Sequence, residues 1–193
     1  MGFLKNSDFT TWAEKWPGTN YLNRFISLDC AADMLALKLF PNGKEVTESF
    51  AMVTAVFSKL PELQRNDTNI TVVVVGDGKR PRTAAMFAFL TKWTCYSIDP
   101  TFHKTDFPIK RLDCFKVKIE DLEPRNYGEN VIIIHPHSHA RCSESIKKIY
   151  GDNRWLISMP CCVEDDVRWF RQGTMYRDEH VLSPKNMIYL YWL

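Results

Sequence analysis

The sequence lacks any apolar run near the roughly 20 residues that a membrane-spanning helix needs, and its first residues have no signal-peptide core. We therefore expect a soluble, cytoplasmic protein with no membrane partner. A disulfide framework is also absent, because the six cysteines are scattered rather than regularly spaced, which suits a reducing compartment. An excess of one charge is also missing, because 25 Lys and Arg residues stand beside 23 Asp and Glu residues. This balance gives no overall argument for a nucleic acid or an anionic membrane.

The chain is long enough for one domain with a full core. With 193 residues and 45% hydrophobic content, we expect a single domain over 1–193. Residues 1–65 form a helical prelude, because apolar residues recur at three- and four-residue spacing over 29–39 and again over 46–60. Pro41-Asn-Gly43 separates these two helices, and Pro61 ends the second.

From residue 66 onward the pattern is typical of an open α/β core. Strands are expected at 70–76, 93–98, 114–119, 131–135 and 154–159, and helices at 82–91, 142–150 and 163–171. The connection 100–113 contains two prolines and is the weakest helix. Residues 174–182 and 187–192 look extended around the turn Ser183–Asn186, which predicts a hairpin. We expect a Rossmann-like, mostly parallel sheet with helices on both faces, a C-terminal antiparallel hairpin and an N-terminal helical extension.

A glycine turn after the first strand carries the strongest functional signal. The β-branched run Thr71–Val75 ends in Gly76-Asp-Gly78, and Asp99 ends the next strand 21 residues after Gly78. Glycines let the backbone turn sharply and let a ligand approach the peptide groups, while a carboxylate at the next strand end can accept hydrogen bonds from ribose hydroxyls. The pattern indicates a nucleoside site at the carboxyl edge of the sheet.

Over residues 66–193 the layout resembles the Rossmann-like class I S-adenosylmethionine-dependent methyltransferases, in which a parallel sheet finishes in a hairpin with one strand reversed. The resemblance implies that S-adenosylmethionine is the cofactor. It also implies a catalytic motif after the fourth strand, where this chain has His135-Pro-His-Ser-His139. The cofactor residues it implies are Gly76, Asp77 and Gly78 for the methionine part, Asp99 for the ribose, and Glu120 or Asp121 for the adenine.

Two positions depart from the family pattern. Val74 stands where an acidic residue usually precedes the first glycine, and Arg80 stands where a third glycine is usual. These departures favour an alternative, a catalytically inactive scaffold with the same fold. Its partner could be a second copy of the chain, bound through the N-terminal helices or the final hairpin, so we also expect a homo-oligomer.

His135 and His137 are the catalytic candidates, because a histidine there can act as a general base near neutral pH. Zinc ligation by the alternating histidines with Cys142, Cys161 or Cys162 is the competing interpretation. Since Pro136 disturbs the strand and no Cys-x-x-Cys spacing is present, we predict no metal site. Ser158-Met-Pro-Cys-Cys162 resembles a turn of some RNA methyltransferase-like proteins.

The basic run Lys79-Arg-Pro-Arg82 stands at a predicted helix start and would attract an anion. The first hypothesis is a divergent S-adenosylmethionine-dependent methyltransferase-like protein that acts on a nucleotide or nucleic acid. The basic run favours a further alternative, an NAD-type protein that binds a phosphate-bearing nucleotide. The predicted terminal hairpin disfavours that alternative.

Overall fold

The computed structural model describes residues 20–162 and 173–193. Within these residues, the sheet is preceded by three helices: α2 (Tyr21–Ile26), α3 (Ala31–Ala36) and α4 (Gly43–Lys59). The last two confirm the helical pattern over 29–39 and 46–60, although α3 is shorter than expected. The side chain of Asn42 caps α4 by accepting a hydrogen bond from the Glu45 amide. Among the described residues, no helix is both long and apolar enough to cross a membrane.

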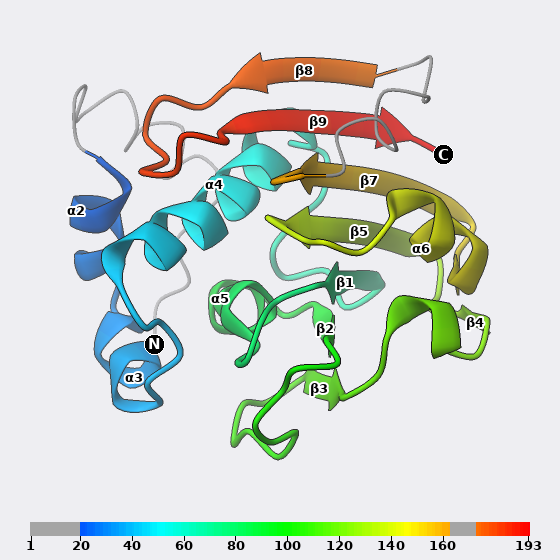
Figure 1. The fold of residues 1–193 in the computed structure, drawn as a ribbon, viewed down its shortest axis with the longest axis horizontal. Helices are drawn as coiled ribbons and strands as arrows, with labels where there is room; N and C mark the ends of the chain where they lie inside the picture. The colour runs from blue at the N-terminus through cyan, green and yellow to red at the C-terminus, as the bar shows by residue number, and fades with distance from the viewer. Residues whose placement is uncertain (1–19, 163–172) are drawn as a thin grey trace.

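Seven strands form the main sheet in the order β3-β2-β1-β5-β7-β9-β8. The first five of these strands pair in parallel, while β9 runs antiparallel to both β7 and β8. Figure 1 shows this reversed strand lying between β7 and β8. Their bounds are β1 (Ile70–Val75), β2 (Thr94–Ile98), β3 (Leu112–Phe115), β5 (Asn130–Pro136), β7 (Asn153–Met159), β8 (Gly173–Arg177) and β9 (Met187–Trp192).

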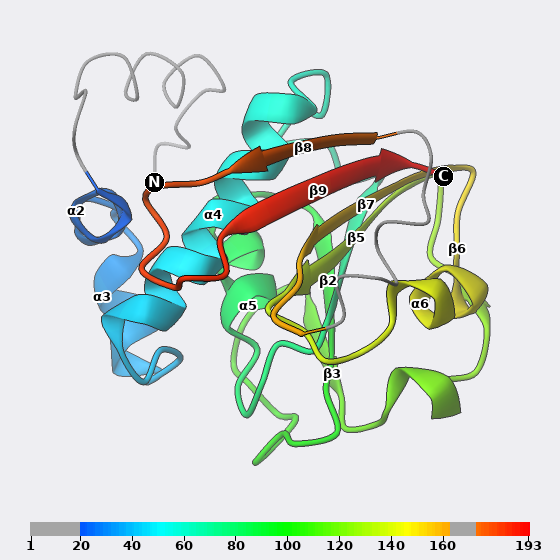
Figure 2. The same cartoon turned by 45° about the horizontal axis from the view of Figure 1, so that its top comes forward.

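Helices cover both faces of this sheet, as predicted. Helices α4 and α5 (Arg82–Leu90) pack on one face, and α6 (Cys142–Lys148) lies on the other (Figure 2). Strand β1 is apolar throughout because it is buried on both sides: Val72 and Val74 join the core under α4 and α5, whereas Val73 and Val75 join the second core. A two-stranded parallel sheet, β4 (Arg125–Asn126) and β6 (Ile149–Tyr150), was not predicted.

Two local predictions need correction, and a third is not tested. The strand expected at 114–119 is β3, which ends at Phe115 because its neighbour β2 ends at the paired Ile98. The chain then makes a short 3-10 turn, η1 (Ile119–Asp121). No helix forms in the connection 100–113, where prolines interrupt the pattern. The helix predicted at 163–171 lies outside the described residues.

The hairpin is present, but its first strand stops at Arg177 rather than 182. Asp178 is buried and ends the strand: its carboxylate accepts hydrogen bonds from the Tyr21 hydroxyl and the His180 amide. Its own amide donates to the Asn186 carbonyl, which closes the loop between β8 and β9. A side chain that bonds its own backbone two residues ahead favours a turn over a continued strand.

Candidate functional site

The turn after β1 is built by its two glycines and the aspartate between them. Gly76 and Gly78 have φ angles of 78° and 82°, in the left-handed region that favours glycine. Asp77 is fully buried and points away from solvent. Its carboxylate accepts hydrogen bonds from the Thr83 and Ala84 amides, at 2.9 and 3.1 Å, and from the Ser97 hydroxyl at 2.9 Å. Asp77 therefore caps α5 from a distance and does not line the cleft described below.

Burial raises the pKa of Asp77 from its ordinary 3.8 to about 6, although its hydrogen bonds act in the opposite sense. Between these two values the folded chain holds the proton more tightly than the unfolded chain. Stability from the protonated Asp77 carboxyl is therefore fully present below pH 3.8 and is lost as the pH rises through about 6, by on the order of 3 kcal/mol.

We expect Asp77→Asn, which cannot ionise, to lack this decline. The difference in unfolding free energy, wild type minus variant, should fall between roughly pH 4 and pH 7 in urea titrations. A difference that grows with pH would mean that the hydrogen bonds outweigh burial, and would contradict the prediction.

Asp99, at the end of β2, faces the glycine turn. Its Oδ2 accepts a hydrogen bond from the Gly78 amide at 2.7 Å, and its Oδ1 accepts from the amide and hydroxyl of Thr101 at 2.7 and 2.5 Å. A carboxylate has about four lone-pair sites. Three are used within the chain, so one lone-pair site remains on Oδ2.

The loop after β3 brings the third acidic position to the same edge of the sheet. Glu120 and Asp121 lie in η1, and both side chains are exposed. They line the same cleft as Gly78 and Asp99. Three successive strand ends therefore converge on one opening, as expected for the carboxyl edge of an open α/β sheet.

The two histidines after β5 have different surroundings. His135 is 1% exposed, and its Nε2 lies 2.8 Å from the Ser145 hydroxyl of α6, away from the cleft. His137 has a φ of 54° and lines the cleft. Its Nε2 lies 2.5 Å from the Lys185 carbonyl oxygen. Since a carbonyl only accepts, this nitrogen carries the hydrogen, and the neutral ring keeps its lone pair on Nδ1. Burial lowers the pKa of His137.

These strand ends surround a cleft of about 1310 Å³ at the carboxyl edge of the sheet. In this sheet β9 lies between β7 and β8 and runs antiparallel to both. The reversed strand β9 distinguishes this sheet from that of the six-stranded dinucleotide-binding fold. The chain has the class I methyltransferase fold.

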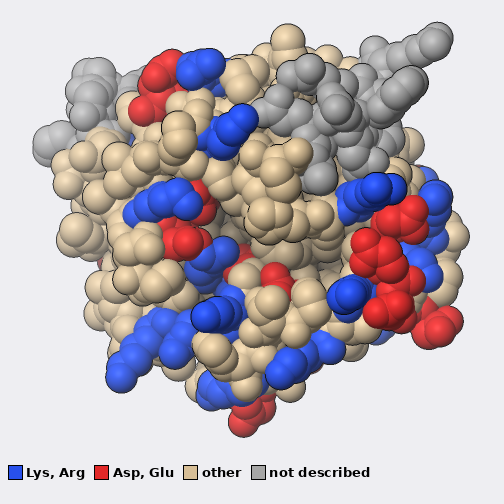
Figure 3. Space-filling view, in the orientation of Figure 1, with Lys and Arg blue, Asp and Glu red and all other residues tan. Residues whose placement is uncertain are grey.

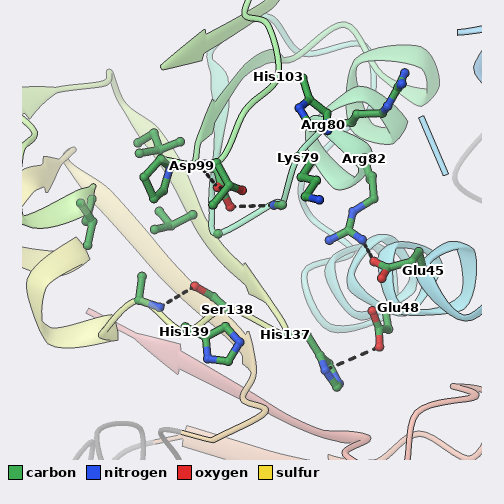
Figure 4. Close-up of a pocket in the computed structure, with 18 of the residues that line it drawn as sticks. Glu45, Glu48, Lys79, Arg80, Arg82, Asp99, His103, His137, Ser138 and His139 are labelled. Atoms are coloured by element: carbon green, nitrogen blue, oxygen red, sulfur yellow. Dashed lines mark hydrogen bonds and ion pairs between the residues drawn. The ribbon is translucent and has the colours of Figure 1, made fainter. Parts of the chain in front are cut away.

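In this methyltransferase-fold chain, α4 supplies the wall of the cleft opposite Asp99 (Figure 4). Glu45 pairs with Arg82, which also donates to the Asp77 carbonyl. Glu48 is buried, and its Oε1 lies 3.0 Å from Lys44 Nζ and 3.5 Å from His137 Nδ1. Burial raises the pKa of Glu48, which Lys44 partly offsets. Acidic and basic groups thus alternate along this wall.

Sequence reasoning missed the part that α4 plays. One feature of the sequence could have indicated it. Glu48 is a charged residue within a stretch of α4 that otherwise consists of apolar and small residues. Ser138 was also missed: it packs directly against Gly76, so the loop after β5 lies close against the glycine turn. Figure 3 shows this face of the molecule hollowed near its centre, with Lys and Arg side chains around the hollow.

Comparison of the sequence with protein-family models found no match, and comparison with curated proteins found none either. Among solved structures, the chain is similar to a mutant of MtNAS in complex with S-adenosylmethionine, with 12% identity, 88% of this chain and 69% of the other covered, and a TM-score of 0.48. It is also similar to coclaurine N-methyltransferase bound to N-methylheliamine and SAH, with 11% identity, 95% and 63% covered, and a TM-score of 0.43. The strand order and the strand directions define the fold of this chain.

Proposed function

We propose that the protein is an S-adenosylmethionine-dependent methyltransferase whose methyl acceptor is a nucleotide or nucleic acid. The observation that carries this proposal is the convergence of Gly78, Asp99 and Glu120 on one cleft at the carboxyl edge of the sheet. The cleft, at about 1310 Å³, is larger than a typical site for one small ligand, about 300–1,000 Å³. There is room for a cofactor and an acceptor group side by side.

The residues present fit the three parts of the cofactor. Asp99 Oδ2 would accept a ribose hydroxyl with its remaining lone pair, and Glu120 or Asp121 would accept from the adenine amino group. The methionine carboxylate would accept a hydrogen bond from Arg82 Nη2, which lies against Gly78, while Arg82 Nη1 stays paired with Glu45. Glu45 and Glu48 would face the ammonium and sulfonium charges.

When bound, S-adenosylmethionine supplies a methyl group on a positively charged sulfur. The chain's own task is to hold the acceptor nitrogen or oxygen in line with that carbon, and positioning supplies most of the acceleration. His137 Nδ1 would take the acceptor's proton, and the Glu48 carboxylate, 3.5 Å away, would stabilise the charge that forms on the ring.

Basic side chains at the cleft support a phosphate-bearing acceptor. Lys44, Lys79 and Lys118 line it, and the side chain of Lys44 is 46% exposed. The cations after the glycine turn do not gather on one anion, however: Arg80 donates to the Leu37 carbonyl and Arg82 pairs with Glu45. This arrangement favours backbone phosphates of an acceptor over the single phosphate cradle of an NAD-type protein.

Methyl transfer from radiolabelled S-adenosylmethionine to RNA, DNA and mononucleotides tests this function. We expect His137→Gln to lower kcat by about 100-fold, because general-base catalysis contributes on that order, with KM for the cofactor unchanged. His103→Gln is the matched control, since His103 lines the same cleft and is exposed. Equal losses in the two variants would contradict the role of His137, and labelling of no nucleic acid or nucleotide would contradict the acceptor class.

A further inference from the structure

Three metal-binding side chains meet where the loops after β5 and β7 leave the sheet. Strands β5 and β7 pair up to Pro136 and Met159, so the two loops begin side by side. The first loop carries His139, and the second carries Cys161 and Cys162. One ligand atom from each of the three residues lies within 4.8 Å of the others.

The distances match one face of a zinc tetrahedron. With Zn–S near 2.3 Å and Zn–N near 2.0 Å, a tetrahedral site separates two sulfurs by about 3.8 Å and a sulfur and a nitrogen by about 3.5 Å. In this chain the two Sγ atoms are 3.5 Å apart. His139 Nδ1 lies 3.0 Å from Cys162 Sγ and 3.8 Å from Cys161 Sγ. Shifts of a few tenths of an ångström in the three side chains would bring these distances to those of a tetrahedral site.

The donor set also selects the class of metal. Two thiolates and an imidazole suit zinc and other borderline or soft ions, whereas Mg²⁺ and Ca²⁺ require oxygen ligands. His139 and Cys161 line the cleft, and Cys162 is exposed, so an ion can enter from solvent. Cys142, a candidate ligand in the sequence, is the first residue of α6, is buried in the core and is not part of the cluster.

We propose that His139, Cys161 and Cys162 bind one zinc ion at the edge of the cleft. Three protein ligands leave the fourth position of the tetrahedron for a water or an acceptor atom, as in catalytic rather than structural zinc sites. The proposal replaces the expectation, drawn from the sequence, that the chain has no metal site. It does not depend on cofactor binding, and it can fail or succeed independently of the proposed methyl transfer.

The test is titration of the full chain, kept reduced by a phosphine, first with Co²⁺ and then with Zn²⁺. We expect one equivalent of cobalt to produce thiolate-to-cobalt charge-transfer bands and the intense visible bands of a tetrahedral site, and zinc to displace it. Azide should shift the visible bands, because it can occupy the open position. Cys162→Ser and His139→Gln should weaken binding by at least about 100-fold.

Cys30→Ser and His103→Gln are the matched controls, because each removes the same chemical group outside the cluster. Both should keep the bands and the stoichiometry. His139 and Cys162 are exposed, so their variants should fold, which circular dichroism of the metal-free proteins checks. The proposal is overturned if no charge-transfer band appears at one equivalent, or if the bands persist in Cys162→Ser and His139→Gln. If azide does not shift the visible bands, the inference that the fourth position is open is overturned.

Discussion

Replacing Gly76 with alanine should lower the free energy of unfolding by roughly 3 kcal/mol, combining left-handed backbone strain with overpacking. The φ of Gly76 is 78°. An added Cβ would lie 2.7 Å from Ser138 Cβ and 3.1 Å from Ser138 Cα, so the clash involves the backbone of the neighbouring loop and cannot be relieved by a rotamer change. Urea unfolding of wild type and variant measures the difference.

Gly128→Ala separates the two causes of this loss. Gly128 also has a positive φ, 118°, but the nearest atom to an added Cβ is Thr71 Oγ1 at 3.9 Å. The Gly128 variant should therefore show the backbone strain without the overpacking, and lose less than half as much stability as Gly76→Ala. Equal losses at the two glycines would contradict the close approach of Ser138 to the turn.

Asp99→Ala should weaken S-adenosylmethionine binding by roughly 10- to 100-fold, the range expected when a charged hydrogen-bond acceptor is removed. Two effects add. The variant lacks the Asp99 carboxylate that would accept a hydrogen bond from the ribose. The Gly78 amide also loses its acceptor, which holds the glycine turn in place. Calorimetric titration of wild type and variant with the same cofactor preparation gives the ratio of the two Kd values.

Asp113→Ala is the control for the change in charge. Asp113 lies in the neighbouring strand β3, is exposed and is not among the residues that line the cleft. Its replacement should leave the Kd within about twofold of wild type, since an exposed charge outside the site is screened by salt. A similar loss in both variants would show that general electrostatics, and not the Asp99 carboxylate, attracts the cofactor.

The elements around the glycine turn could be predicted from the sequence because their signals are local. A β-branched run buried on both faces, two glycines at positive φ and an aspartate at the next strand end each have one simple physical cause. The reversed hairpin followed in the same way from two extended segments around a turn. These features were enough to predict the sheet and the edge at which the cleft opens.

Contacts between distant segments could not be predicted in this way. Nothing in the spacing of His139 and the two adjacent cysteines reveals that β5 and β7 are neighbours and end level with one another. Asp77 occupies a position between two glycines that suggests ligand contact, yet the start of α5 supplies amides that bind its carboxylate internally. The direction of a side chain in a tight turn depends on such partners, which the order of residues along the chain does not specify.

Calorimetric titration of the wild-type chain with S-adenosylmethionine, with NAD and ATP as comparison ligands, shows which of the three ligands the cleft binds. The expected result is saturable binding of one S-adenosylmethionine per chain, competition by S-adenosylhomocysteine, and much weaker binding of NAD and ATP. Tighter binding of NAD or ATP would contradict it and favour a phosphate-binding protein. No binding of any of the three would contradict it as well, and would make an inactive scaffold with this fold the better explanation.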